Sequence, residues 1–202
     1  MKKASMNVPN TLSIIRVLLV PLFVASLLFM CDDSKYGIWS YIVPAVIYIV
    51  TGLTDMLDGK IARKYNLVTD FGKFIDPLAD KFMVLSSMIA ILVWMMLRGD
   101  TDLALVFVWV VLVILLRELG VTSLRLVVAG KSGIVVAASL LGKIKTVSQM
   151  VGTVVLIVEP MIPFFSENHI LSYVFMAIMA FTTLFSGIDY LKAYLPHIDS
   201  NK

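Results

Sequence analysis

Six long runs of apolar residues limit what this chain can fold into. A helix needs roughly 20 mostly apolar residues to cross the hydrocarbon layer of a membrane, and each run is close to that length or longer. The runs lie at Leu12–Met30, Ile38–Leu57, Phe74–Leu97, Leu103–Val128, Ile134–Val158 and Ile170–Leu191. We therefore expect an all-α, polytopic membrane protein with about six transmembrane helices.

The overall composition agrees with a membrane location and argues against an ordinary soluble domain. Of the 202 residues, 59% are hydrophobic and only 15% are charged, whereas a soluble domain is about half apolar and a quarter charged. The length suits one integral-membrane domain over residues 1–202 rather than two domains. The formal net charge of +3 is too small to indicate a nucleic-acid partner, so none is expected.

The basic residues between the runs predict which side of the membrane each connection faces. Gly- and Pro-containing breaks separate the runs, including Gly59–Thr69 and Ala129–Gly133. Alternate connections and the termini hold most of the cations: Lys2, Lys3, Lys60, Arg63, Lys64, Arg125, Lys131, Lys143, Lys145, Lys192 and Lys202. The other connections hold only Lys35 and Arg98, beside several acidic residues. Because Lys and Arg collect on the cytoplasmic side, both termini are expected in the cytoplasm.

Four aspartates lie where two of the apolar runs approach each other. Asp55 and Asp58 are three residues apart and Asp76 and Asp80 are four apart, so each pair shares one face of a helix. An ionised carboxylate within a membrane is expensive and usually faces a cavity, a metal or a partner. Oxygen ligands suit Mg²⁺, Mn²⁺ or Ca²⁺ rather than zinc. Two such metals would form the usual clamp for phosphoryl chemistry.

Three further residues of this segment suit a phosphate ligand. Gly59 and Gly72 permit a helix end or a close approach of the backbone to a ligand. Arg63 offers a planar pair of donors to phosphate oxygens. The topology places the segment at the cytoplasmic end of the second and third spans.

The complete pattern resembles the signature of the CDP-alcohol phosphatidyltransferase family. Its residues are Asp55-x-x-Asp58-Gly59-x-x-Ala62-Arg63, then eight residues, then Gly72-x-x-x-Asp76-x-x-x-Asp80. The earlier stretch Pro9-Asn10-x-Leu12-Ser13-x-x-Arg16 is similar to the opening of the same family, with Ser13 in place of the usual threonine. The resemblance extends over most of the chain.

The resemblance implies transfer of a phosphatidyl group from CDP-diacylglycerol to an alcohol, with release of CMP. It implies a two-metal centre of Mg²⁺ or Mn²⁺ held by Asp55, Asp58, Asp76 and Asp80, with Asp80 also the general base. The implied CDP-lipid site consists of Asn10, Gly59, Ala62, Arg63 and Gly72. It also implies a homodimer in the plasma membrane of a bacterial cell, in contact with membrane lipid, with the active site facing the cytoplasm.

A second group of basic residues bears on the acceptor alcohol. Arg117, Arg125, Lys143 and Lys145 exceed what a metal-bound diphosphate needs and suit an anionic acceptor such as glycerol 3-phosphate. Arg117 and Arg125 are eight residues apart, so they can share a helix face. Glu118 could instead orient one of these cations. The stretches around them resemble the bacterial branch of the family that makes phosphatidylglycerol phosphate, in phospholipid biosynthesis.

Other functions remain open at this point. A related phosphatidyltransferase acting on inositol phosphate, serine or another alcohol is the nearest alternative, and inositol phosphate would need as much positive charge. A divalent-cation transporter would place ionisable groups through the membrane depth, often in related halves. Here they are biased to one side. A prenyl-diphosphate enzyme would carry an Asp-Asp-x-x-Asp run, and no such run is present on that side.

Overall fold

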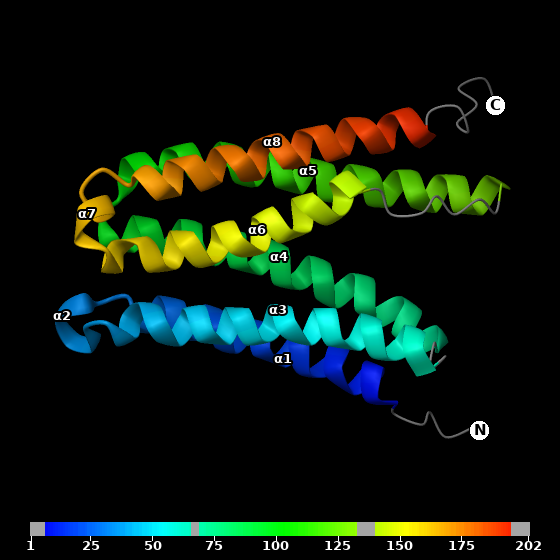
Figure 1. Cartoon of the computed structure of the whole chain (residues 1–202), viewed down its shortest axis with the longest axis horizontal. Helices are drawn as coiled ribbons and strands as arrows, with labels where there is room; N and C mark the ends of the chain where they lie inside the picture. Colours follow the sequence, from blue (N-terminus) through cyan, green and yellow to red (C-terminus); the bar gives the residue numbers. More distant parts are fainter. Residues whose placement is uncertain (1–6, 66–68, 133–139, 195–202) are drawn as a thin grey trace.

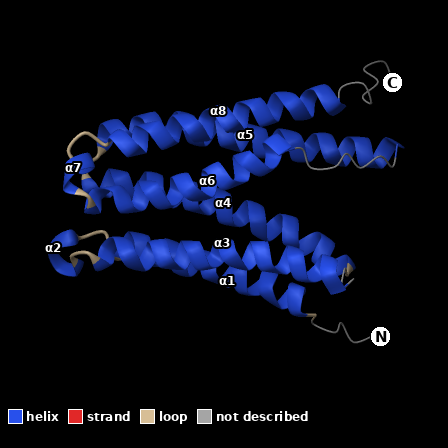
Figure 2. Cartoon of the chain, viewed as in Figure 1, coloured by secondary structure: helices blue, strands red, loops and turns tan. Residues whose placement is uncertain are grey.

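The computed structural model describes residues 7–65, 69–132 and 140–194. Within these ranges the side chains of residues 56, 58–64, 70, 73, 129, 131 and 132 are not described. The elements are α1 (Val8–Phe29), α2 (Asp33–Tyr36), α3 (Trp39–Tyr65), α4 (Asp70–Arg98), α5 (Thr101–Ser132), α6 (Leu140–Val158), the 3₁₀ turn η1 (Glu159–Met161), α7 (Pro163–Ser166) and α8 (Ile170–Tyr194). Helices and short loops account for all of the described chain, which confirms the all-α prediction (Figure 2).

Each predicted run coincides with a long helix, and five helices are long and apolar enough to span a membrane. The exception among the described residues is α3, whose apolar part, Trp39–Asp55, is shorter. The predicted count of about six therefore consists of five full-length candidates and one shorter helix. The apolar part of α3 ends where the aspartate motif begins.

Helices extend into two of the predicted breaks. α3 runs through Gly59 to Tyr65, and α5 runs to Ser132. A glycine inside a helix costs only about 1 kcal/mol, and Lys and Arg are good helix formers, so hydropathy falls there without ending the helix. The predicted span Ile134–Val158 begins at Leu140 among the described residues, and residues 133–139 lie outside them.

The long helices run roughly along one axis and form two groups (Figure 1). α1 packs against both α3 and α4, while α8 packs against both α5 and α6. Contacts of α4 with α5 and of α3 with α6 join the groups. The start of α1, the end of α3, the start of α4 and the end of α8 lie at one end of the bundle, with α2 and α7 at the other (Figure 1). We call these the motif end and the α2/α7 end.

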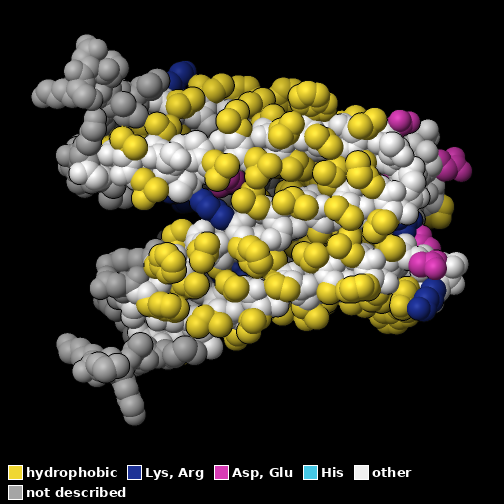
Figure 3. Space-filling view, turned by 180° about the vertical axis from the view of Figure 1, so that it is seen from behind, with side chains coloured by type: hydrophobic (Ala, Val, Ile, Leu, Met, Phe, Trp, Pro, Cys, Tyr) yellow, Lys and Arg dark blue, Asp and Glu magenta, His cyan; other side chains and the backbone are white. Residues whose placement is uncertain are grey.

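The core is apolar and lies between the two groups. It includes Phe23 of α1, Tyr48 of α3, Trp94 of α4 and Phe107 of α5, each at most 2% exposed. The rings of Phe23 and Tyr48 are 5.2 Å apart between centroids. Many large apolar side chains cover the outside of the bundle, as expected for helices surrounded by lipid (Figure 3). This packing holds the helices so that their polar residues meet at the motif end.

Candidate active site

One face of α1 joins the carboxylates of α3 and α4. Ser13 and Arg16 are both fully buried and lie one turn apart on that face. Ser13 Oγ donates a hydrogen bond of 2.5 Å to Asp76 Oδ1 of α4. Arg16 Nη1 lies 2.8 Å from Asp55 Oδ1 of α3. α1 therefore positions two of the four motif aspartates from one side.

The start of α4 packs closely against α1. Thr69 caps the helix, accepting a 3.0 Å hydrogen bond from the Gly72 amide and donating one of 3.0 Å to Asn10 Oδ1. A Cβ at Gly72 would lie only 2.9 Å from Asn10 Oδ1, closer than real side chains approach. Glycine is needed there because Asn10 occupies the space. Both residues are expected in the CDP-lipid site, and the structure brings them together.

Asp80 lies on α4, the helix that packs against α1 of one group and against α5 and α6 of the other. Asp80 lies one turn beyond Asp76, and the charged groups that act on it include Asp55, Glu118 of α5 and Lys145 of α6. Seen from behind, the bundle has a hollow at its motif end, and both Lys or Arg and Asp or Glu side chains lie in it (Figure 3). The aspartates and part of the basic group therefore share one region of the molecule.

Glu118 lies at the centre of the basic group. Its side chain is buried, and the Lys145 ammonium donates a hydrogen bond to its Oε1. Arg117 Nη1 donates to the same oxygen at 3.0 Å, and Lys81 Nζ lies 3.9 Å from Oε2. The alternative that Glu118 orients a cation agrees with these contacts. One carboxylate thus interacts with cations from α4, α5 and α6.

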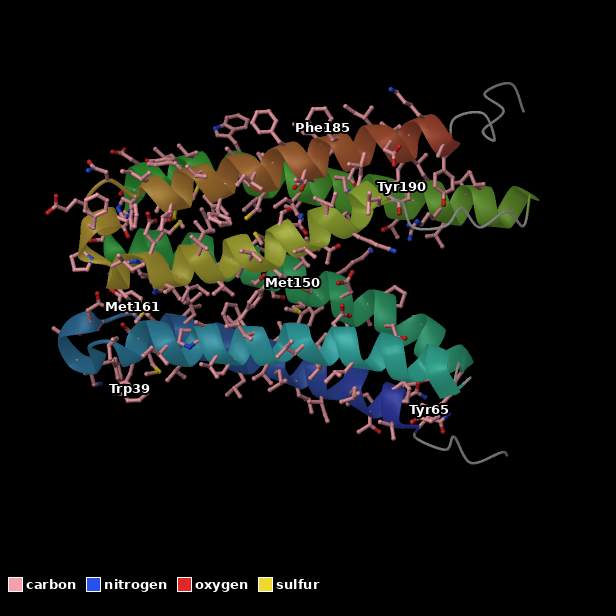
Figure 4. The ribbon with its side chains drawn as sticks, in the orientation of Figure 1. Trp39, Tyr65, Met150, Met161, Phe185 and Tyr190 are labelled. Atoms are coloured by element: carbon pink, nitrogen blue, oxygen red, sulfur yellow. The ribbon has the colours of Figure 1, made fainter. Side chains whose placement is uncertain are left out.

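Tyr190 of α8 supports both arginines of α5. The guanidinium carbons of Arg117 and Arg125 lie 5.2 and 4.9 Å from the centre of its ring. Arg125 Nη2 donates a 2.7 Å hydrogen bond to the Tyr190 hydroxyl, and Arg117 Nη2 donates one of 2.7 Å to Ser186 Oγ. Tyr190 lies on the side of α8 that faces α5 (Figure 4). The predicted common face of the two arginines is confirmed by this shared partner.

Comparison with known proteins identifies the family. The family model described as CDP-alcohol phosphatidyltransferase matches residues 6–185. The chain belongs to this family. Proteins named CDP-diacylglycerol–glycerol-3-phosphate 3-phosphatidyltransferase are similar to it along nearly their whole length. The Bacillus subtilis protein is 38% identical over 192 residues, covering 92% of this chain and 94% of the relative. The Pseudomonas fluorescens protein is 34% identical over 198 residues, covering 97% and 94%.

The side-chain geometry at four of the family's motif positions stays a prediction. Asp58, Gly59, Ala62 and Arg63 lie within the last turns of α3, and their side chains lie outside the described residues. Among the described residues, no group of three or more His, Cys, Asp or Glu side chains is placed to hold a metal ion. The all-oxygen donor chemistry of Asp55, Asp76 and Asp80 nevertheless fits a hard divalent cation such as Mg²⁺ or Mn²⁺.

The two lysines assigned to the acceptor site differ in their surroundings. Lys145 is buried beside Glu118, whereas Lys143 is exposed and forms no hydrogen bond or ion pair with a described residue. Residues two apart point to nearly opposite sides of a helix, so both could not face the same cavity. Of these two lysines, Lys145 contacts Glu118 among the described residues, and the role predicted for Lys143 stays a prediction.

Two residues of α8 that contact the arginines, Ser186 and Tyr190, were not predicted from the sequence. Both lie in an apolar run, where a serine or tyrosine resembles an ordinary core residue. A usable signal was present, since Ser186, Tyr190 and Tyr194 recur every four residues and so form one stripe along the helix. The stripe faces the arginines of α5.

Proposed function

We propose that this chain transfers a phosphatidyl group from CDP-diacylglycerol to glycerol 3-phosphate, giving phosphatidylglycerol phosphate and CMP. The observation that carries the proposal is that three cations gather around one carboxylate, Glu118. These cations are Lys81, Arg117 and Lys145. A neutral acceptor alcohol would leave their charge only partly balanced by Glu118 inside the membrane domain, whereas an acceptor phosphate offsets it.

Asp80 is the group we propose as general base. Asp80 is near enough to Asp55, Glu118 and Lys145 for their charges to act on it, and we propose that the acceptor hydroxyl meets its carboxylate. Removal of the hydroxyl proton makes the acceptor oxygen the nucleophile that attacks the phosphorus of CDP-diacylglycerol. The bond from that phosphorus to the CMP oxygen breaks, and CMP leaves with the electron pair.

Asp55, Asp58, Asp76 and Asp80 would hold two divalent cations, Mg²⁺ or Mn²⁺, on the diphosphate side of the site. When bound, such cations neutralise the diphosphate and stabilise CMP as a leaving group. Arg16 and Ser13 orient Asp55 and Asp76 toward this region. Asn10 and Gly72, with Gly59, Ala62 and Arg63, would contact the CDP part of the lipid.

The placement in the cell is also a proposal. The start of α1 and the end of α8 lie at the motif end of the bundle, the end that also holds the aspartate motif (Figure 1). With the distribution of Lys and Arg, this supports a multi-pass enzyme of the bacterial plasma membrane whose active site and termini face the cytoplasm. The apolar outer faces leave room for a homodimer.

An acceptor-specific assay tests the proposed function. Purified protein in detergent is supplied with CDP-diacylglycerol, a divalent cation and one radiolabelled acceptor at a time: glycerol 3-phosphate, inositol phosphate or serine. Lipid product is expected only with glycerol 3-phosphate, and only when Mg²⁺ or Mn²⁺ is present. If the protein made lipid product from another acceptor but not from glycerol 3-phosphate, the acceptor assignment would be overturned. Full activity in excess EDTA would overturn the metal centre.

A further inference from the structure

Among the described residues of the site, Glu118 is a buried carboxylate that the proposed reaction does not use. It belongs to neither the metal ligands nor the base, and its own charge would repel an acceptor phosphate. A buried ion pair is weak evidence for stability, because well-packed apolar residues of the same volume often stabilise a protein equally well. Its presence among the cations therefore calls for a role other than holding the helices together.

The contacts of Glu118 fix the distance between two cations from different helices. The Lys145 ammonium of α6 and the Arg117 guanidinium of α5 donate to the same oxygen, Oε1. Two donors that share one acceptor lie within about 6 Å of each other. That separation lets both nitrogens reach oxygens of a single phosphate group. Without the shared oxygen, two like charges in a low dielectric would repel each other.

Both cations keep donors that Glu118 does not use. A lysine ammonium has three N–H groups, and among the described residues Lys145 spends one on Glu118. Arg117 is held from a second side by Ser186 and from a third by the Tyr190 ring. Arg117 is therefore fixed in orientation, and Lys145 is fixed in place with unused donors.

We infer that Glu118 is a positioning residue for the acceptor phosphate: it holds Lys145 and Arg117 at the separation that binds one phosphate beside Asp80. Glu118 does not contact the substrate and takes no part in proton transfer. The inference rests on the proposed function, because it requires an acceptor that carries a phosphate. It adds a specificity element built on α4, α5 and α6 to a site whose other half is built on α1, α3 and α4.

Substitution of Glu118 tests the inference through the two Michaelis constants. Glu118→Gln keeps the shape and removes the charge, so Lys145 and Arg117 lose the anion that holds them together. The KM for glycerol 3-phosphate is expected to rise about tenfold, and the KM for CDP-diacylglycerol to change less than twofold. Glu118→Asp keeps the charge on a shorter stem and should recover part of the loss.

Glu159 provides a matched control at the opposite end of the bundle. It is as deeply buried as Glu118, but its carboxylate accepts hydrogen bonds from the Leu171 and Ser172 amides rather than from cations. Glu159→Gln should lower the thermal unfolding midpoint and leave both KM values unchanged. It therefore separates the general cost of altering a buried carboxylate from an effect on the acceptor.

The outcomes distinguish the inference from the function on which it rests. Wild-type protein that uses a different phosphorylated acceptor contradicts the proposed function, and the same KM comparison is then made with that acceptor. Equal increases in both KM values for Glu118→Gln, or an unchanged acceptor KM, would overturn the positioning role. If Glu118→Gln does not yield folded protein, Glu118→Asp decides by the same comparison, and a selective rise in its acceptor KM is the supporting result.

Discussion

The two ends of the bundle treat charged side chains in different ways. At the α2/α7 end, Arg98 donates to both oxygens of Asp33, each at 2.7 Å, and its guanidinium also lies against the rings of Tyr41 and Trp94. Arg98 and Asp33 thus form a two-point pair of fixed geometry, and Arg98 Nε also lies 3.9 Å from Asp100 Oδ2. The pair joins the end of α4 to the short helix α2 and requires no further ligand.

Around Glu118, toward the motif end, charge is shared rather than paired. Glu118 receives Lys145 and Arg117 on one oxygen and faces Lys81 with the other. The cations outnumber this carboxylate and come from three helices, while Asp80 carries charge nearby. The comparison indicates that an ion pair whose charges balance, such as Arg98–Asp33, holds helices together in this protein. Shared and unequal charge marks the part that needs a substrate.

The largest expected effect is the loss of turnover in Asp80→Asn. An amide cannot take the acceptor proton, and a positioned general base contributes about 10²–10⁴-fold to the rate. The kcat is expected to fall by that factor, while binding of CDP-diacylglycerol, measured separately with labelled lipid, remains largely intact because the other motif aspartates are unchanged. Near-normal turnover in a folded Asp80→Asn protein would show that Asp80 is not the base.

The next effect should appear at the opposite end and on a different property. Arg98→Ala removes four hydrogen bonds, two to Asp33 and one each to the Tyr41 hydroxyl and the Cys31 carbonyl, and the contacts with two rings. We expect a loss of about 2 kcal/mol in stability, seen as a drop of about 5 °C in the thermal midpoint in detergent, with both KM values unchanged. A selective rise in the KM for glycerol 3-phosphate would show that the α2/α7 end also affects acceptor binding, and it would contradict the distinction between the two ends.

A smaller effect is expected for Arg125→Ala. Arg125 is stacked on Tyr190 and more exposed than Arg117, so it would meet the acceptor phosphate at the edge of the site. The KM for glycerol 3-phosphate should rise up to about tenfold, about the value of one charge-assisted hydrogen bond, and more than the KM for CDP-diacylglycerol. Lys143→Ala is the control, since Lys143 is exposed and away from the group. Equal changes in both KM values for Arg125→Ala would indicate a structural role.

Much of the fold and part of the candidate site could be predicted from the sequence. Runs of apolar residues located all six long helices, and the spacing of Arg117 and Arg125 predicted their common face. The ends of α3 and α5 could not be predicted from hydropathy, because Gly59 and the neighbouring basic residues leave the apolar layer without leaving the helix. Loss of hydropathy marks a membrane boundary and not a helix end.

The pairing of side chains between helices was harder to predict. α5 and α8 are apolar on nearly all sides, so hydropathy does not tell which face of either helix turns toward the other. The contacts of Tyr190 with the arginines, and of Glu118 with Lys145, depend on that rotation. Only the recurrence of polar residues every four positions on α8 carried a signal for it.

The smallest expected effect is the pH dependence contributed by the Arg98–Asp33 pair at the α2/α7 end. The hydrogen bonds from Arg98 lower the pKa of Asp33 from 3.8 to about 2, with smaller help from the Tyr41 and Ser40 hydroxyls. The unfolded chain therefore binds a proton at Asp33 at higher pH than the folded chain does, so this pair stabilises the fold fully above about pH 4 and progressively less down to about pH 2.

Thermal midpoints of wild type and Asp33→Asn, measured from pH 6 to pH 2, isolate this contribution from that of the other carboxylates. The wild type should unfold at a higher temperature than Asp33→Asn above pH 4, and the gap should close toward pH 2. The gap is expected to be modest because the Asp33 side chain is 42% exposed and water screens the pair. A gap that stays constant over this range would show that the Arg98–Asp33 pair does not stabilise the folded protein through its charge.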